Sequence, residues 1–117
     1  MNTSNDKWHP VADINDIPLR GSRRVLLTDH QIALFRTAEN KVYALRDSCP
    51  HKAGPLSAGI VHDECVTCPL HNWVISLKSG KALGADKGCT PVFPIKVVDQ
   101  QVLVKLELYT AAQPVNT

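Results

Sequence analysis

Two short segments, each with one cysteine and one histidine, constrain this chain more than any other feature. The first is Cys49-Pro50-His51, and the second is Cys68-Pro69-Leu70-His71. Residues 52–67 separate them, which is long enough for a short hairpin that brings the two segments together. Thiolate and imidazole are ligands for zinc and for iron–sulfur clusters, whereas magnesium and calcium prefer oxygen. The chain is therefore expected to bind a metal centre through Cys49, His51, Cys68 and His71.

Zinc in a Cys₂His₂ site is the main alternative for such a ligand set. Zinc fingers usually pair Cys with Cys, and then His with His at helical spacing. Here each segment holds one of each, and the spacing from His51 to His71 suits no helix. The pattern C-x-H, spacer, C-x-x-H resembles that of Rieske [2Fe–2S] domains, in which two thiolates bind one iron and two imidazoles bind the other. The spacing therefore favours a Rieske-type cluster over zinc.

The length of the chain bounds the number of domains. With 117 residues and 12.8 kDa, we expect one domain over residues 8–108, with a cluster-binding part at about 47–91 and flexible termini at 1–7 and 109–117. The formal charge of +2 is too balanced to indicate a nucleic-acid partner. No apolar run approaches the ~18–20 residues of a membrane span. The polar start of the chain, 1–6, lacks the apolar core of a signal peptide, so the expected location is cytoplasmic.

Short apolar runs separated by turn residues dominate the rest of the chain, and they predict an all-β fold. Helical periodicity is weak, with at most one turn at 13–16. Two stretches, 47–59 and 84–94, are rich in Gly and Pro and are expected to be irregular. The expected strands cover residues 8–12, 23–28, 32–37, 42–46, 60–62, 65–67, 73–77, 95–98 and 102–106.

The resemblance to Rieske domains implies more than the ligand set. It implies a fold of stacked small antiparallel sheets, with a cluster-binding subdomain formed by the two ligand loops. It also implies that Cys49 and Cys68 bind the buried iron and that His51 and His71 bind the outer iron, which accepts the electron.

Residues beside the ligands indicate a subtype of Rieske protein. Respiratory Rieske proteins carry an extra cysteine in each ligand loop, and these two cysteines form a disulfide. Here Gly54 and Leu70 occupy those positions. The same proteins place hydroxyl groups near the cluster sulfurs, where this chain has Trp73 and Ile75. Because hydrogen bonds to the sulfurs favour the reduced state, we predict a potential at the lower end of the Rieske range.

Longer stretches resemble the small subunit of assimilatory NAD(P)H nitrite reductase. They are residues 49–61, the run Cys68-Pro69-Leu70-His71-Asn72-Trp73, residues 77–82 and the run Gly84-Ala85-Asp86-Lys87-Gly88-Cys89. The resemblance implies a large partner that carries FAD, an iron–sulfur cluster and sirohaem, and that reduces nitrite to ammonium with NAD(P)H during nitrate assimilation. This chain has no nucleotide-binding fingerprint, so it would relay electrons without catalytic residues of its own.

Two other functions remain open at this point. A free Rieske ferredoxin would deliver electrons to an aromatic-ring dioxygenase or a similar oxygenase, but such carriers are often acidic, and the charge of +2 counts mildly against this interpretation. A metal-stabilised binding module or iron sensor is the third possibility. Cys65 and Cys89 are interpreted as packing residues rather than as ligands.

Overall fold

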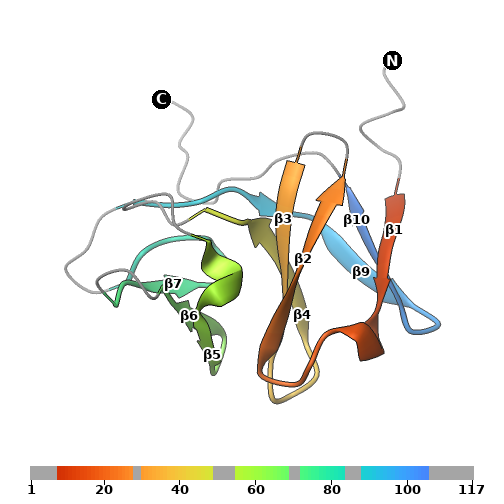
Figure 1. Cartoon of the computed structure of the whole chain (residues 1–117), viewed down its shortest axis with the longest axis horizontal. Helices are drawn as coiled ribbons and strands as arrows, with labels where there is room; N and C mark the ends of the chain where they lie inside the picture. Colours follow the sequence, from red (N-terminus) through yellow and green to blue (C-terminus); the bar gives the residue numbers. More distant parts are fainter. Residues whose placement is uncertain (1–7, 28–29, 49–54, 69–71, 84–87, 106–117) are drawn as a thin grey trace.

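Three small antiparallel sheets make up the protein, as seen in a computed structural model that describes residues 8–27, 30–48, 55–68, 72–83 and 88–105 (Figure 1). The first sheet has the order β1 (Trp8–Asp13), β10 (Gln101–Lys105), β9 (Ile95–Val98). The second has the order β2 (Gly21–Leu27), β3 (His30–Arg36), β4 (Val42–Arg46), β8 (Val92–Phe93). The third has the order β5 (Ile60–His62), β6 (Cys65–Thr67), β7 (Val74–Ser76). The predicted all-β fold of stacked small sheets is confirmed.

Sequence patterns located most strands well. The predictions for 42–46, 60–62, 65–67 and 95–98 match β4, β5, β6 and β9. The turn expected at 13–16 is the 3-10 helix η2 (Ile14–Asp16), which the Asp13 side chain caps. Two elements were not predicted, namely β8 and the 3-10 helix η3 (Leu56–Ala58), because both lie inside stretches that looked irregular. The predicted flexible termini lie outside the described residues.

The second sheet is buried on both faces, which explains the nearly continuous apolar run in β3. Side chains of a strand alternate between the two faces of its sheet. Ile32 and Leu34 accordingly belong to one core cluster, whereas Ala33 and Phe35 belong to the other. The same alternation divides β4, whose Ala44 and Leu45 belong to different clusters.

Each of the two clusters joins the second sheet to one of its neighbours. The cluster that contains Ile32 and Leu34 also contains Val102 and Val104 of β10, so it seals the first sheet against the second. The cluster that contains Phe35 joins the second sheet to the third, and its other members are Ala33, Leu45, Leu56, Val61, Val66, Cys68, Ile75 and Leu77. Figure 1 shows the resulting order, with β2–β4 between the β5–β7 sheet and the sheet of β1, β9 and β10. Among the described residues, no helix is long and apolar enough to cross a membrane.

Candidate metal centre

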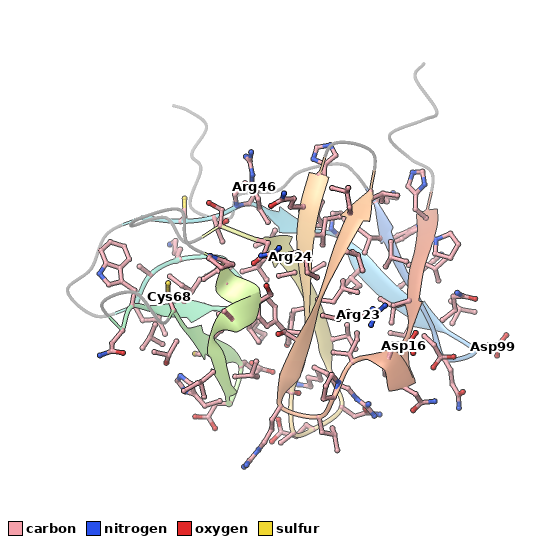
Figure 2. All side chains as sticks on the ribbon, viewed as in Figure 1. Asp16, Arg23, Arg24, Arg46, Cys68 and Asp99 are labelled. Atoms are coloured by element: carbon pink, nitrogen blue, oxygen red, sulfur yellow. The ribbon has the colours of Figure 1, made fainter. Side chains whose placement is uncertain are left out.

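The second predicted ligand segment begins at Cys68, directly after β6. Cys68 is fully buried and packs in the core cluster between the second and third sheets (Figure 2). Its backbone N–H donates to the Trp73 carbonyl at 2.7 Å, so the two ends of this segment are joined by a main-chain hydrogen bond. Asn72 has a φ of 57°, the left-handed conformation that Asn tolerates better than most residues. The backbone therefore turns sharply before it enters β7.

The first predicted ligand segment follows β4. Its start, at Asp47 and Ser48, is held by main-chain hydrogen bonds, from the N–H of Asp47 to the Gln31 carbonyl at 2.9 Å and from the N–H of Ser48 to the Arg46 carbonyl at 2.8 Å. The chain returns to described residues at Pro55 and forms η3, whose Leu56 is fully buried. Both ends of the segment are therefore anchored to the body of the protein.

The hairpin predicted between the two segments is formed by β5 and β6, and it brings the described residues on its two sides together. Ile60 is paired with Thr67 across the hairpin. Gly59, at the end of η3, lies so close to the Thr67 carbonyl oxygen that a Cβ at this position would collide with it. Leu56 and Cys68 belong to the same buried cluster. The described residues that follow the first segment, 56–59, are thus adjacent in space to Cys68, where the second segment starts.

A third segment, Gly88–Pro91, lies beside the start of the first. The N–H of Arg46 donates to the Pro91 carbonyl at 2.9 Å, and the N–H of Thr90 donates to the Gly80 carbonyl at 2.8 Å. Gly80 has a φ of 76°, and a Cβ there would collide with the Thr90 carbonyl oxygen, so this turn requires glycine. The sequence had predicted an irregular third segment here without predicting what it contacts.

Of the four predicted ligands, the structure describes only Cys68, because Cys49, His51 and His71 lie outside the described residues. Within the described part of the chain, no three His, Cys, Asp or Glu side chains form a group that could hold a metal ion. The donor set is consistent with an iron–sulfur centre, since a buried cysteine in an apolar cluster is a suitable site for a soft thiolate ligand. Described residues that flank the two segments, Leu56 and Cys68, also lie in one cluster, as a shared centre would require.

Cys65, Cys89 and His62, which lie outside the predicted ligand set, have ordinary surroundings. Cys65 is half-buried on β6 opposite Ser76, and Cys89 is half-buried at an isolated bridge to Lys81. Burial raises the pKa of the Cys65 thiol, and the nearby acidic side chains of the β5–β6 turn raise it further. The ring Nε2 of His62 lies 2.6 Å from the hydroxyl of Thr67.

A cluster of charges at the β5–β6 turn was missed by sequence reasoning. The Glu64 carboxylate accepts a hydrogen bond from the Tyr43 hydroxyl at 3.0 Å and forms ion pairs with Lys41 at 3.2 Å and Lys78 at 3.6 Å. Hydrogen bonds from Lys41 and Tyr43 lower the pKa of Glu64. Burial, followed by the hydrogen bond to Glu64, raises the pKa of Tyr43 to about 12. These contacts join the second sheet to the third on the exposed side of their shared core.

Three small antiparallel sheets around two buried clusters define a small all-β domain, and the predicted ligand Cys68 lies in the cluster shared by the second and third sheets. Comparison with known families identifies the type of domain, because the model of the Rieske-like [2Fe–2S] domain matches residues 7–105. The chain belongs to this family, whose cofactor is a [2Fe–2S] cluster and whose members act as electron-transfer domains of oxidoreductase systems.

The relatives similar to this chain include components of dioxygenase systems and of nitrite reductases. The chain is 35% identical to the ferredoxin subunit of anthranilate 1,2-dioxygenase from Burkholderia cepacia, over 86% of this chain and 93% of that protein. It is 31% identical to the ferredoxin component of the naphthalene 1,2-dioxygenase/salicylate 5-hydroxylase systems of Ralstonia sp., over 86% and 96%. A crystal structure assigned as the small subunit of an NADPH nitrite reductase superimposes with a TM-score of 0.76 at 32% identity, over 84% and 97%.

Proposed function

We propose that Cys49, His51, Cys68 and His71 bind one Rieske-type [2Fe–2S] cluster, with the two cysteines on one iron and the two histidines on the other. When bound, the cluster supplies one-electron transfer. The burial of Cys68 supports this assignment because it places a thiolate ligand away from water. The hairpin that joins the two ligand segments supports it as well, since one cluster needs ligands from both.

Anaerobic purification followed by iron, zinc and acid-labile sulfide analysis tests the ligand set. We expect two irons and two sulfides per chain and the electron paramagnetic resonance signal of a reduced Rieske centre. Cys68→Ser should abolish both the bound iron and sulfide and the resonance signal. Cys65→Ser is the matched control, because it makes the same change three residues earlier and should leave the cluster intact. A colourless protein with one zinc and no sulfide would support the Cys₂His₂ alternative instead.

For the biological role, we propose that the chain is the small subunit of an assimilatory NAD(P)H nitrite reductase and relays electrons in support of nitrite reduction to ammonium. The observation that carries this proposal is the run Cys68–Trp73, in which Asn72-Trp73 follows the second ligand histidine as in that subunit. The structural likeness to a nitrite reductase small subunit at 32% identity supports it. The partner would be a cytoplasmic large subunit that carries FAD and sirohaem.

A free ferredoxin for a ring-hydroxylating dioxygenase is the second candidate. The 35% identity to the anthranilate dioxygenase ferredoxin favours it, since that relative is matched over almost its whole length. Against it stands the formal charge of +2, because an acidic surface commonly steers such carriers to their reductases.

Deletion of the gene separates the two candidates. If the chain serves nitrite reductase, the deletion strain should fail to grow on nitrite as sole nitrogen source and should grow normally on ammonium. The tagged chain should also co-purify with a flavin- and sirohaem-containing subunit. Normal growth on nitrite, together with electron delivery from the purified chain to a ring-hydroxylating oxygenase, would establish the second candidate instead.

A further inference from the structure

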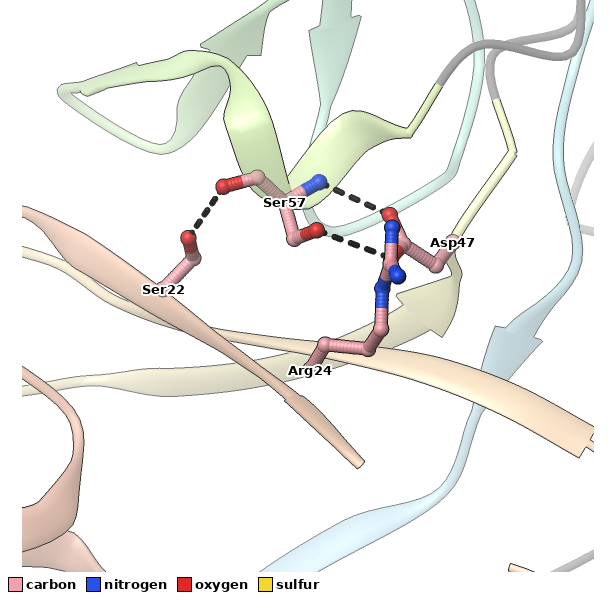
Figure 3. Close-up of polar contacts among 4 residues, drawn as sticks. All are labelled: Ser22, Arg24, Asp47 and Ser57. Atoms are coloured by element: carbon pink, nitrogen blue, oxygen red, sulfur yellow. Dashed lines mark hydrogen bonds and ion pairs between the residues drawn. The ribbon is translucent and has the colours of Figure 1, made fainter. Parts of the chain in front are cut away.

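Asp47 directly precedes the first ligand segment, and its side chain is fully buried. A buried carboxylate is costly unless hydrogen-bond donors surround it. Within the described part of the chain, three donors do so here, and they come from two residues, Ser57 and Arg24 (Figure 3). Neither partner is a neighbour of Asp47 in the sequence.

Ser57 holds the carboxylate with two hydrogen bonds. Its backbone N–H donates to Oδ1 of Asp47 at 2.8 Å, and its hydroxyl donates to Oδ2 at 2.8 Å. The residues between the two partners are 48–56, and they include the predicted ligands Cys49 and His51. The Asp47–Ser57 contact therefore closes the base of the first ligand segment.

The closed base is also attached to the second sheet. Nε of Arg24, on β2, donates to Oδ2 of Asp47 at 2.7 Å, and the Arg24 side chain remains 53% exposed. The hydroxyl of Ser22, also on β2, donates to the Ser57 carbonyl at 2.6 Å. Asp47 and Ser57, which flank the ligand segment, are thus bonded to the same strand, which is paired along its whole length with β3 of the central sheet.

The second ligand segment is closed in a different way. Its ends are joined by the main-chain hydrogen bond from Cys68 to Trp73, which any side chain at these positions would allow. At the first segment, the carboxylate of Asp47 makes the equivalent connection. The closure of the first segment is therefore sensitive to substitution of one side chain.

We propose that Asp47 is a positioning residue for the cluster: it holds the first ligand segment in the conformation that presents Cys49 and His51. This inference rests on the ligand set proposed above. Without the carboxylate, the contact that fixes the distance between residues 47 and 57 is lost. The segment between them then samples more conformations. Ligands on a looser segment release the metal centre more readily.

The test compares two carboxylate-to-amide variants of the purified, cluster-loaded protein. Asp47→Asn removes an acceptor of the closing contact. Glu64→Gln makes the same chemical change at a carboxylate that also makes three polar contacts, but those contacts join two sheets instead of closing a ligand segment. The rate of cluster loss to a chelator is followed by visible absorbance, the reduced signal by electron paramagnetic resonance, and the stability of each protein by thermal unfolding.

We expect Asp47→Asn to lose the cluster about tenfold or more faster than the wild type, as for loss of one hydrogen bond to a charged group. Its resonance signal should broaden because the ligand geometry becomes heterogeneous. Glu64→Gln should lower thermal stability without either effect. Ser57→Ala keeps the N–H donor and the Arg24 pair, so it should fold and give a smaller acceleration, even if Asp47→Asn does not fold.

Two contrary results are distinguishable from each other. A wild-type protein that binds no Rieske cluster would overturn both the ligand set and the positioning role. A wild-type protein with the cluster, together with equal loss rates for Ser57→Ala, Asp47→Asn and Glu64→Gln, would overturn the positioning role alone. The rate of cluster loss, the resonance signal and the thermal stability do not depend on which enzyme the chain serves.

Discussion

The hydroxyl of Tyr43 donates a hydrogen bond to the carboxylate of Glu64 at 3.0 Å, and this bond links β4 to the turn between β5 and β6. The third sheet, which leads into the predicted ligand Cys68, is therefore tied to the central sheet by a titratable pair. Lys41 and Lys78 add ion pairs to the same carboxylate. These contacts lead to a prediction about alkaline pH.

Tyr43 should ionise later than an ordinary tyrosine, because burial and the Glu64 hydrogen bond raise its pKa to about 12. In the unfolded chain a tyrosine ionises near pH 10. The neutral hydroxyl therefore contributes stability below about pH 10, and this contribution is lost as the pH rises towards 12. Absorbance titration of tyrosinate measures the effect, with Tyr43→Phe as the control that leaves only Tyr109. Complete tyrosinate formation in the folded protein near pH 10 would contradict the prediction.

Leu34 fills the core between the first and second sheets, so truncating it should destabilise the protein strongly. Leu34→Ala leaves a cavity at a fully buried position and should cost about 2–5 kcal/mol of unfolding free energy. Leu26→Ala is the matched control, because Leu26 is 70% exposed and its loss should change stability by less than about 0.5 kcal/mol. Urea unfolding of both variants gives the comparison. Equal costs would mean that the burial of β3 is not what holds these sheets together.

Cys65 should react slowly with alkylating reagents, since its raised pKa keeps the thiol protonated near neutral pH. The rate of iodoacetamide modification at this residue, followed by fragment mass spectrometry, should rise only at a pH above that of an ordinary thiol. Unfolding the chain should restore the ordinary rate. Asp63→Asn should increase the rate modestly, because Asp63 is one of the charges that raise the pKa. A fast reaction of folded Cys65 at neutral pH would count against the packing interpretation.

The reduction potential of the loaded protein should lie near the lower end of the Rieske range, close to about −150 mV. The reason is the absence of hydroxyl groups at Trp73 and Ile75, the latter fully buried in the core. Trp73→Ser should raise the potential relative to Trp73→Ala, since the two variants differ only by a hydroxyl that can hydrogen-bond to the centre. Protein-film voltammetry measures both. A strongly positive midpoint in the wild type would contradict the prediction.

The sequence alone predicted a [2Fe–2S] centre, which the family supports, and the positions of most strands. Both depend on local patterns. The spacing of cysteines and histidines indicates the ligand set, and the alternation of apolar residues marks strands such as β4 and β9. β8 escaped prediction because it has two residues and exists through its pairing with Ala44 and Leu45. A strand of two residues is too short to show an alternation of apolar and polar side chains.

What only the tertiary structure decided is which distant residues meet. The sequence contains Asp47, Ser57 and Arg24, but nothing in their spacing pairs them. They meet because β2 and β4 flank β3 in the central sheet, while η3 packs Leu56 into the shared core. The partners of Glu64 are likewise determined by the packing of the third sheet on the second. Local patterns predict element type and ligand chemistry, whereas the burial of two sheet faces determines which side chains from distant elements meet.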